Sequence, residues 1–96
     1  MKGKCSEHLK RIAELQENDF KRGGYERAAV AVKELEDNLV DLEGLSDLDF
    51  QQYPGIGKSI SAEMVAFFES PDGITSKLLE MQSEKENRDG FKDLPF

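Results

Sequence analysis

Tryptophan is absent from this 96-residue sequence, cysteine occurs once, and there is no long apolar run. The single cysteine, Cys5, excludes a framework of internal disulfides and is typical of a reducing compartment. A helix that crosses a membrane needs about 20 apolar residues, and no such segment exists. The first ten residues, MKGKCSEHLK, also lack the apolar stretch of a secretory signal. We therefore expect an intracellular protein, in the cytoplasm or the nucleus.

Basic residues are scarce relative to acidic ones. The chain has 13 Lys and Arg against 20 Asp and Glu, and its formal net charge is −7. This balance argues against a general polyanion binder. The charge is uneven, because residues 34–49 contain acidic side chains and no basic one, whereas the segment before them is mildly basic. We interpret this acidic region as a solvated helix end and loop, or as an edge that repels nucleic acid and contacts a protein partner.

Apolar residues follow the spacing of helices, and no stretch alternates as a half-buried strand would. Ser46 and Asp49 have the spacing of a capping box at the start of a short helix. Gly23 and Gly24 predict a turn between the first two helices. The pattern predicts helices at 5–18, 25–39, 46–52, 57–69 and 74–81.

The predicted helices indicate an all-α fold, a small bundle of four to five helices joined by short loops that contains one helix-hairpin-helix motif, described below. We expect residues 1–81 to form the domain and the polar residues 82–96 to form a flexible tail. Cys5 is expected in the core, where it behaves as a small apolar residue. His8 has no Asp or Cys partner at a recognisable metal spacing, so the sequence assigns it no role.

The most specific segment is YPGIGKS, residues 53–59. Its end, Gly57-Lys58-Ser59, matches the last three residues of a nucleotide-binding P-loop. A P-loop also needs a first glycine five positions before Gly57 and a buried strand ahead of it. Position 52 is Gln52, and the residues before it have a helical pattern, so the P-loop is excluded.

The start of the same segment favours a helix-hairpin-helix motif. Tyr53 and Ile56 would point into the core, Pro54 and Gly55 would form the turn, and Gly57 would open the next helix. The N-terminus of that helix leaves N–H groups unpaired, so it can bind a phosphate oxygen. Glycine also lets a nucleic-acid backbone approach closely. The alternative is a turn between two helices that binds no ligand.

The hairpin belongs to a wider pattern. HLKRIAELQENDFKRGGYERAAVAVKEL, residues 8–35, precedes YPGIGKSISAEMVAFFES, residues 53–70. Together they resemble the N-terminal domain of family X DNA polymerases, of the DNA polymerase beta type, over residues 5–81. The resemblance implies a DNA-repair module that binds single-stranded or gapped DNA at the 5′-phosphate side. Such contacts go to phosphates, so binding would not depend on base sequence.

The resemblance also bears on catalysis. In several family members this domain is a lyase, whose lysine forms a Schiff base with a 5′-deoxyribose phosphate. The position that matches this lysine is Glu63 here. A carboxylate cannot form a Schiff base, and its charge would repel the phosphate. We therefore expect no catalytic residue and no catalysis by this chain, although a longer parent could be a DNA polymerase.

The resemblance implies particular DNA contacts. Lys21 and Tyr25 match residues near the 5′-phosphate, and Lys77 matches a later lysine that contacts phosphate. Ser59 stands in the place of a lysine of the hairpin helix, and Lys58 precedes it by one residue. Judged from the residues alone, Tyr25 could instead pack in the core, and Lys21 could be solvated.

The resemblance further implies a monovalent cation, Na⁺ or K⁺, held by main-chain carbonyl groups at Gln51, Tyr53 and Ile56. No other cofactor is expected. Two hypotheses remain open: a non-sequence-specific DNA-binding module, and a protein-interaction helical domain that keeps the fold without binding DNA. The acidic region and Glu63 favour the second. We prefer the first because of the hairpin, Lys21 and Tyr25.

Overall fold

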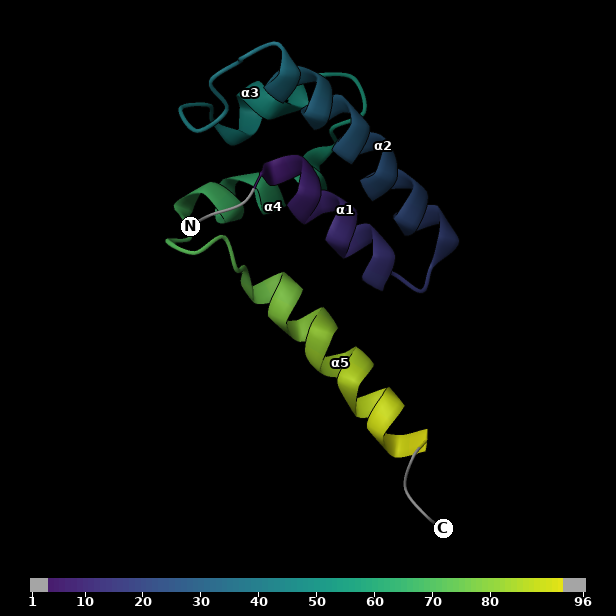
Figure 1. The fold of residues 1–96 in the computed structure, drawn as a ribbon. Coiled ribbons are helices and arrows are strands. Elements are labelled where there is room, and N and C mark those ends of the chain that lie inside the picture. Colours follow the sequence, from purple (N-terminus) through teal and green to yellow (C-terminus); the bar gives the residue numbers. More distant parts are fainter. Residues whose placement is uncertain (1–3, 93–96) are drawn as a thin grey trace.

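The helices of the chain form a bundle from which the last one projects (Figure 1). The computed structural model describes residues 4–92, with side chains through residue 85. These residues form five helices and no strand, which confirms the predicted all-α fold. The helices are α1 (Cys5–Leu15), α2 (Asp19–Asp37), α3 (Asp47–Gln51), α4 (Lys58–Glu69) and α5 (Ser76–Lys92). No helix in this part of the chain is long and apolar enough to cross a membrane.

The core lies between α1, α2 and α4. Leu9 and Ile12 of α1 are fully buried, as are Ala28 and Val32 of α2. Buried alanines on both helices, Ala13 on α1 and Ala28 and Ala29 on α2, let the two helices approach closely. Met64 of α4 is also fully buried, so this helix closes the core from the other side.

Helix α2 begins earlier than the glycines predict. The Asn18 side chain accepts hydrogen bonds from the N–H groups of Phe20 and Lys21, at 2.9 and 3.1 Å, and caps the helix. Gly23 and Gly24 therefore lie inside α2, and the predicted turn there is wrong. Each glycine disfavours a helix by about 1 kcal/mol, a cost that the cap and the buried face downstream outweigh.

Two other boundaries differ from the sequence prediction. α1 ends at Leu15, and α2 ends before Leu39, which has a φ of 61° and a side chain that is 91% exposed. Leu39 was expected on the apolar face of the second helix, and that expectation is wrong. The helical spacing continued past the point where the chain turns, so spacing alone did not mark the end.

Helix α3 and the turn to α4 follow the prediction closely. Ser46 and Asp49 form the capping box, since each side chain accepts a hydrogen bond from the other's backbone N–H. Ile56 is 4% exposed and anchors the turn in the core. Gly55 has a φ of +90°, which favours glycine, and a Cβ placed on it would lie 3.7 Å from the Arg27 carbonyl oxygen. The turn thus packs directly on α2.

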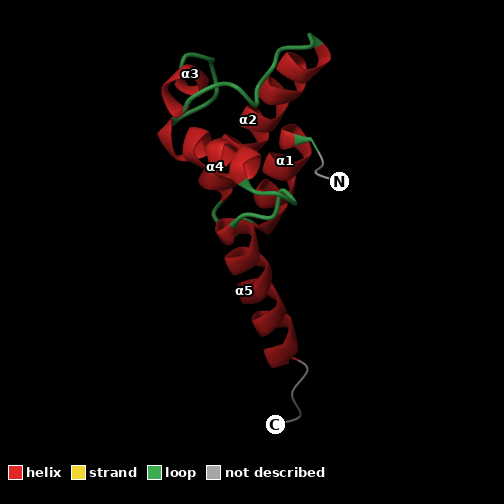
Figure 2. Ribbon diagram, turned by 90° about the vertical axis from the view of Figure 1, so that its left-hand side faces the viewer, coloured by secondary structure: helices red, strands yellow, loops and turns green. Residues whose placement is uncertain are grey.

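Helix α5 is longer than predicted. It spans Ser76–Lys92, whereas the sequence predicted a helix at 74–81 followed by an irregular tail. Ile74 precedes the helix, and Leu78 is its buried anchor. The polar residues beyond position 81 are mostly good helix formers, so polarity alone does not break the helix. Figure 2 shows α5 extending away from the other helices; residues 93–96 of the expected tail lie outside the described part.

The capping box gives a direct test of this fold. We expect Ser46→Ala to lower the free energy of unfolding by about 1 kcal/mol, because the Asp49 N–H loses its acceptor. Urea denaturation measures the change. Ser83→Ala, at an exposed position in α5, is the matched control and should not lower stability, because alanine is a better helix former than serine. Equal effects of the two substitutions would contradict the role of the cap.

Candidate functional site

A pocket of about 600 Å³ opens where the end of α1, the start of α2, the first turn of α4 and the first half of α5 meet. Four of the residues that the sequence analysis singled out as DNA contacts line it: Lys21 and Tyr25 from α2, Ser59 from α4 and Lys77 from α5. They come from three helices that are far apart in the sequence. The fold therefore brings them together on one concave surface.

Two basic side chains of the pocket, Lys21 and Lys77, lie in the first turns of their helices. Lys21 lies in the first turn of α2, which the Asn18 cap fixes. Lys77 lies in the first turn of α5, where the Thr75 hydroxyl accepts a hydrogen bond from the Leu78 N–H at 3.2 Å. The Lys77 ammonium sits 5.7 Å from the centre of the Tyr25 ring, within the range of a cation–π contact. Tyr25 is 5% exposed, so its ring serves both the core and the pocket wall.

The pocket is not strongly basic. Its lining carries three basic side chains, Lys21, Arg27 and Lys77, and three acidic ones. The acidic lining residues are Glu17, Glu80 and Glu84. Among the described residues, none of the three basic side chains forms an ion pair, so their N–H donors remain available. The near balance of charge limits the affinity for any anion.

The other predicted contact residues lie on the α3–α4 turn, outside the pocket lining. Lys58 is the exposed first residue of α4. Gly57 is the N-cap residue of α4, with an extended backbone (φ −90°, ψ −179°) that any residue adopts. A Cβ placed on Gly57 would meet nothing within 4 Å, so the fold itself does not require glycine there. Gly55 differs, because its positive φ makes it a structural glycine.

Three main-chain carbonyls were expected to hold a monovalent cation. Gln51 ends α3, and Tyr53 and Ile56 lie in the turn that follows. The Tyr53 carbonyl accepts a hydrogen bond from the Ile56 N–H at 3.3 Å. Within residues 4–92, the Gln51 and Ile56 carbonyls accept no hydrogen bond. Two of the three acceptors are therefore free to bind a cation.

Glu63 lies in the core and does not line the pocket. It is 6% exposed, and its Oε2 is 3.6 Å from Nε2 of His8, which is also 6% exposed. The His8 ring packs on Phe67, with ring centres 4.8 Å apart. This pair was not predicted from the sequence, because the charge of Glu63 was expected to face the phosphate and His8 had no assigned role. A signal was present, since His8 falls on the same helical face as Cys5 and Ile12.

Cys5 completes the polar part of the core. Its thiol is 1% exposed, as expected for a small core residue. Burial, with a further contribution from the charges of Glu36 and Glu63, raises the pKa of Cys5 to about 12. The thiol therefore stays protonated at neutral pH and is a poor nucleophile.

The acidic region 34–49 is partly structural. Glu36 accepts hydrogen bonds from the backbone N–H and the hydroxyl of Ser6, which ties α2 to α1. Ser6 lies inside α1, in its first turn, and makes this contact from there. Asp47 accepts a hydrogen bond from the Ser61 hydroxyl, which links α3 to α4. Such contacts account for part of the acidic block without any partner.

Comparison with known proteins found no family model, no curated protein and no solved structure that matches this chain. The function must therefore be argued from the site.

A double-mutant cycle tests the buried His8–Glu63 pair. Nε2 of His8 and Oε2 of Glu63 are both buried and form no hydrogen bond, so their 3.6 Å contact is the polar neighbour that each has. Glu63→Leu and His8→Leu should each destabilise the fold by about 1–3 kcal/mol, because each removes that neighbour from the other side chain. The double variant should lose less than the sum of the two, by about 0.5–3 kcal/mol. Urea denaturation of the four proteins measures the coupling. Additive losses would show that the two side chains do not interact.

Proposed function

We propose that this chain is a DNA-binding module of the helix-hairpin-helix type that contacts phosphates without reading base sequence. One observation carries the proposal. Lys21, Tyr25, Ser59 and Lys77, each implied separately by the resemblance to the N-terminal domain of family X polymerases, line a single pocket. An arbitrary set of four residues from three helices would not be expected to converge in this way.

The chemistry of the pocket suits a phosphate group. Lys21 and Lys77 supply ammonium groups, and Ser59 supplies a hydroxyl. Ser59 also lies in the first turn of α4, a 12-residue helix whose N-cap residue makes no side-chain hydrogen bond to the helix. The N–H groups of that turn are therefore open to an anion. The α3–α4 turn forms the hairpin of the motif, and the Gln51 and Ile56 carbonyls would help to hold a monovalent cation there.

A lyase reaction does not fit the residues of this chain. The Schiff base needs an amine at the position of Glu63, and that side chain is buried against His8. Lys77 lies in the pocket, where its ammonium is in contact with the Tyr25 ring, and it serves the phosphate in this proposal. The proposed function is therefore binding, at the 5′-phosphate side of single-stranded or gapped DNA.

Titration with gapped DNA, with and without a 5′-phosphate, tests the pocket at several salt concentrations. We expect weak binding that prefers the phosphorylated gap and is insensitive to base sequence. Lys21→Ala and Lys77→Ala should each weaken binding and reduce the salt slope by about one. Lys85→Ala, an exposed lysine outside the pocket, is the control and should change neither value. If gapped DNA does not bind, the protein-interaction hypothesis takes its place.

Gly57 separates a binding role of the hairpin from a folding role. Because a Cβ on Gly57 meets open space, Gly57→Ala should leave the protein folded, with a loss of at most about 1 kcal/mol in the free energy of unfolding because alanine is a poorer N-cap residue than glycine. It should weaken binding of gapped DNA severalfold, because the added methyl group stands where a phosphate approaches the start of α4. Gly44→Ala, in a loop remote from the pocket, is the matched control. Wild-type affinity in a folded Gly57→Ala protein would show that this end of α4 does not contact DNA.

A further inference from the structure

The acidic side chains of the pocket proposed to bind DNA have no role in the proposed function. Beside its basic residues, the pocket lining includes Glu17, Glu80 and Glu84. Glu17 comes from the segment between α1 and α2 and already has an interaction within the protein. Glu80 and Glu84 both come from α5, and we call them the α5 carboxylates. A cleft that only attracts phosphate carries charge of one sign, so two carboxylates in its wall call for an explanation.

The α5 carboxylates lie in one row with Lys77. The three residues follow one another at spacings of three and four positions, which places them on the same face of a helix. A helix rises by about 1.5 Å per residue, so Glu80 and Glu84 lie about 4.5 and about 10 Å further along its axis than Lys77. Figures 1 and 2 show α5 extending away from the other helices. The row therefore begins with a cation next to the bundle and continues with two anions away from it.

The charges of the α5 carboxylates are not neutralised by the cations of the pocket. Both glutamates are exposed. Among the residues whose side chains are described, neither one forms an ion pair or a side-chain hydrogen bond. The Lys77 ammonium lies instead 5.7 Å from the centre of the Tyr25 ring, which belongs to α2. A strand that followed α5 out of the pocket would therefore meet two uncompensated negative charges.

The cationic side of the pocket suits a single phosphate group. Lys21, Ser59 and Lys77 supply its donors, and they come from three helices. A phosphate at the end of a strand is a monoester with a charge of about −1.5 to −2, whereas a phosphate within the strand is a diester with one charge. A terminal phosphate continues into DNA on one side only. An internal phosphate has a neighbouring phosphate on each side, so it needs two open paths out of the pocket.

We propose that Glu80 and Glu84 restrict this pocket to the end of a strand, a specificity that rests on the proposed function. The carboxylates repel a phosphate on the α5 side, because like charges at close range repel each other. The α4 side differs, since it has the exposed Lys58 and the open N–H groups of the first turn of α4. The strand therefore leaves the pocket along the start of α4. A strand without a phosphorylated end has no such one-sided arrangement and is disfavoured.

A comparison of two DNA ligands tests this specificity. One is a linear single strand with a 5′-phosphate, and the other is the same sequence closed into a circle, which has no end. The wild type should bind the linear strand more tightly at low salt. Glu80→Gln with Glu84→Gln should raise the affinity for the circle about fivefold and that for the linear strand by no more than about twofold. The preference for the phosphorylated end would thus become narrower.

Charge reversal at the same two positions gives a larger effect. Glu80→Lys with Glu84→Lys makes the row on α5 entirely basic, so a strand can follow this helix. The affinity for the circle should rise further, and its salt slope should increase by about two, because two more phosphates are neutralised. An unchanged salt slope would show that DNA does not pass along α5 and would overturn the proposal.

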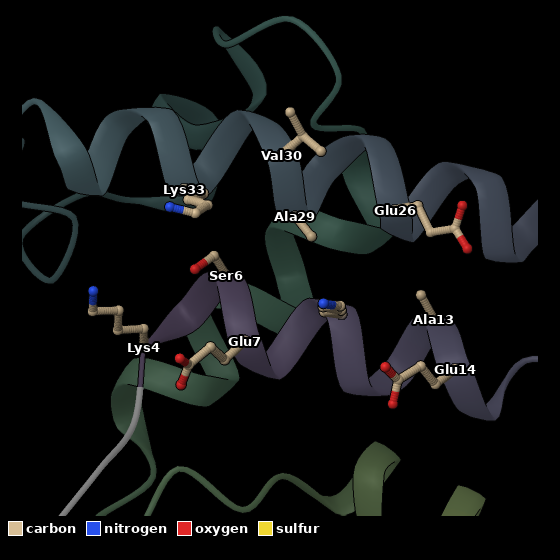
Figure 3. A pocket seen from close by; sticks show the side chains of 10 residues that line it. Lys4, Ser6, Glu7, Ala13, Glu14, Glu26, Ala29, Val30 and Lys33 are labelled. Carbon is tan, nitrogen blue, oxygen red and sulfur yellow. The ribbon is translucent and has the colours of Figure 1, made fainter.

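The matched control is Glu7→Gln with Glu34→Gln. It changes the net charge as the Glu80→Gln and Glu84→Gln pair does, at exposed positions outside the pocket. Figure 3 shows Glu7 near the start of α1. The contact of Ser6 with Glu36 joins this end of α1 to the end of α2, whereas the pocket lies at the end of α1 and the start of α2. The control should keep the wild-type preference.

The outcomes separate this inference from the proposed function. If Lys21→Ala weakens binding of the phosphorylated strand but the Glu80→Gln and Glu84→Gln pair keeps the wild-type preference, the inference is wrong and the proposed function stands. A control that narrows the preference equally would also overturn the inference, because net charge would explain the effect. If the wild type binds neither ligand, both the proposed function and the inference fail. Circular dichroism would establish that every variant is folded.

Discussion

The close contact between α1 and α2 is the constraint on which the other features depend. Ala13 and Ala29 let the two helices approach closely, and the Ser6–Glu36 hydrogen bonds fix their register. This pair forms one side of the core, against which α4 places Met64. The pocket proposed to bind DNA lies at one end of this pair, where α4 and α5 also contribute to its lining.

Where one short segment determines the local structure, its sequence was sufficient to predict that structure. The capping box at Ser46 and the buried Ile56 follow from short-range rules, and so does the all-α class. The same rules failed at Gly23 and Gly24, because a helix cap and buried residues further along outweigh the weak preference of two glycines. They also failed for the length of α5. The polar residues after position 81 were expected to form a flexible tail, although most of them are good helix formers.

In the candidate site, too, some features could be predicted from the sequence and others could not. The resemblance to a polymerase domain pointed to Lys21, Tyr25, Ser59 and Lys77, and their convergence became visible only in three dimensions. The His8–Glu63 pair could not be predicted by spacing, because its members lie on α1 and α4 and meet only after the chain folds.

The burial of Glu63 limits how this domain could change during evolution. A lysine introduced at that position would place an ammonium group beside the His8 imidazole, away from water and without a carboxylate partner. The replacement would therefore be disfavoured unless His8 changed as well. We therefore expect the effect of a lysine at position 63 to depend on which residue occupies position 8.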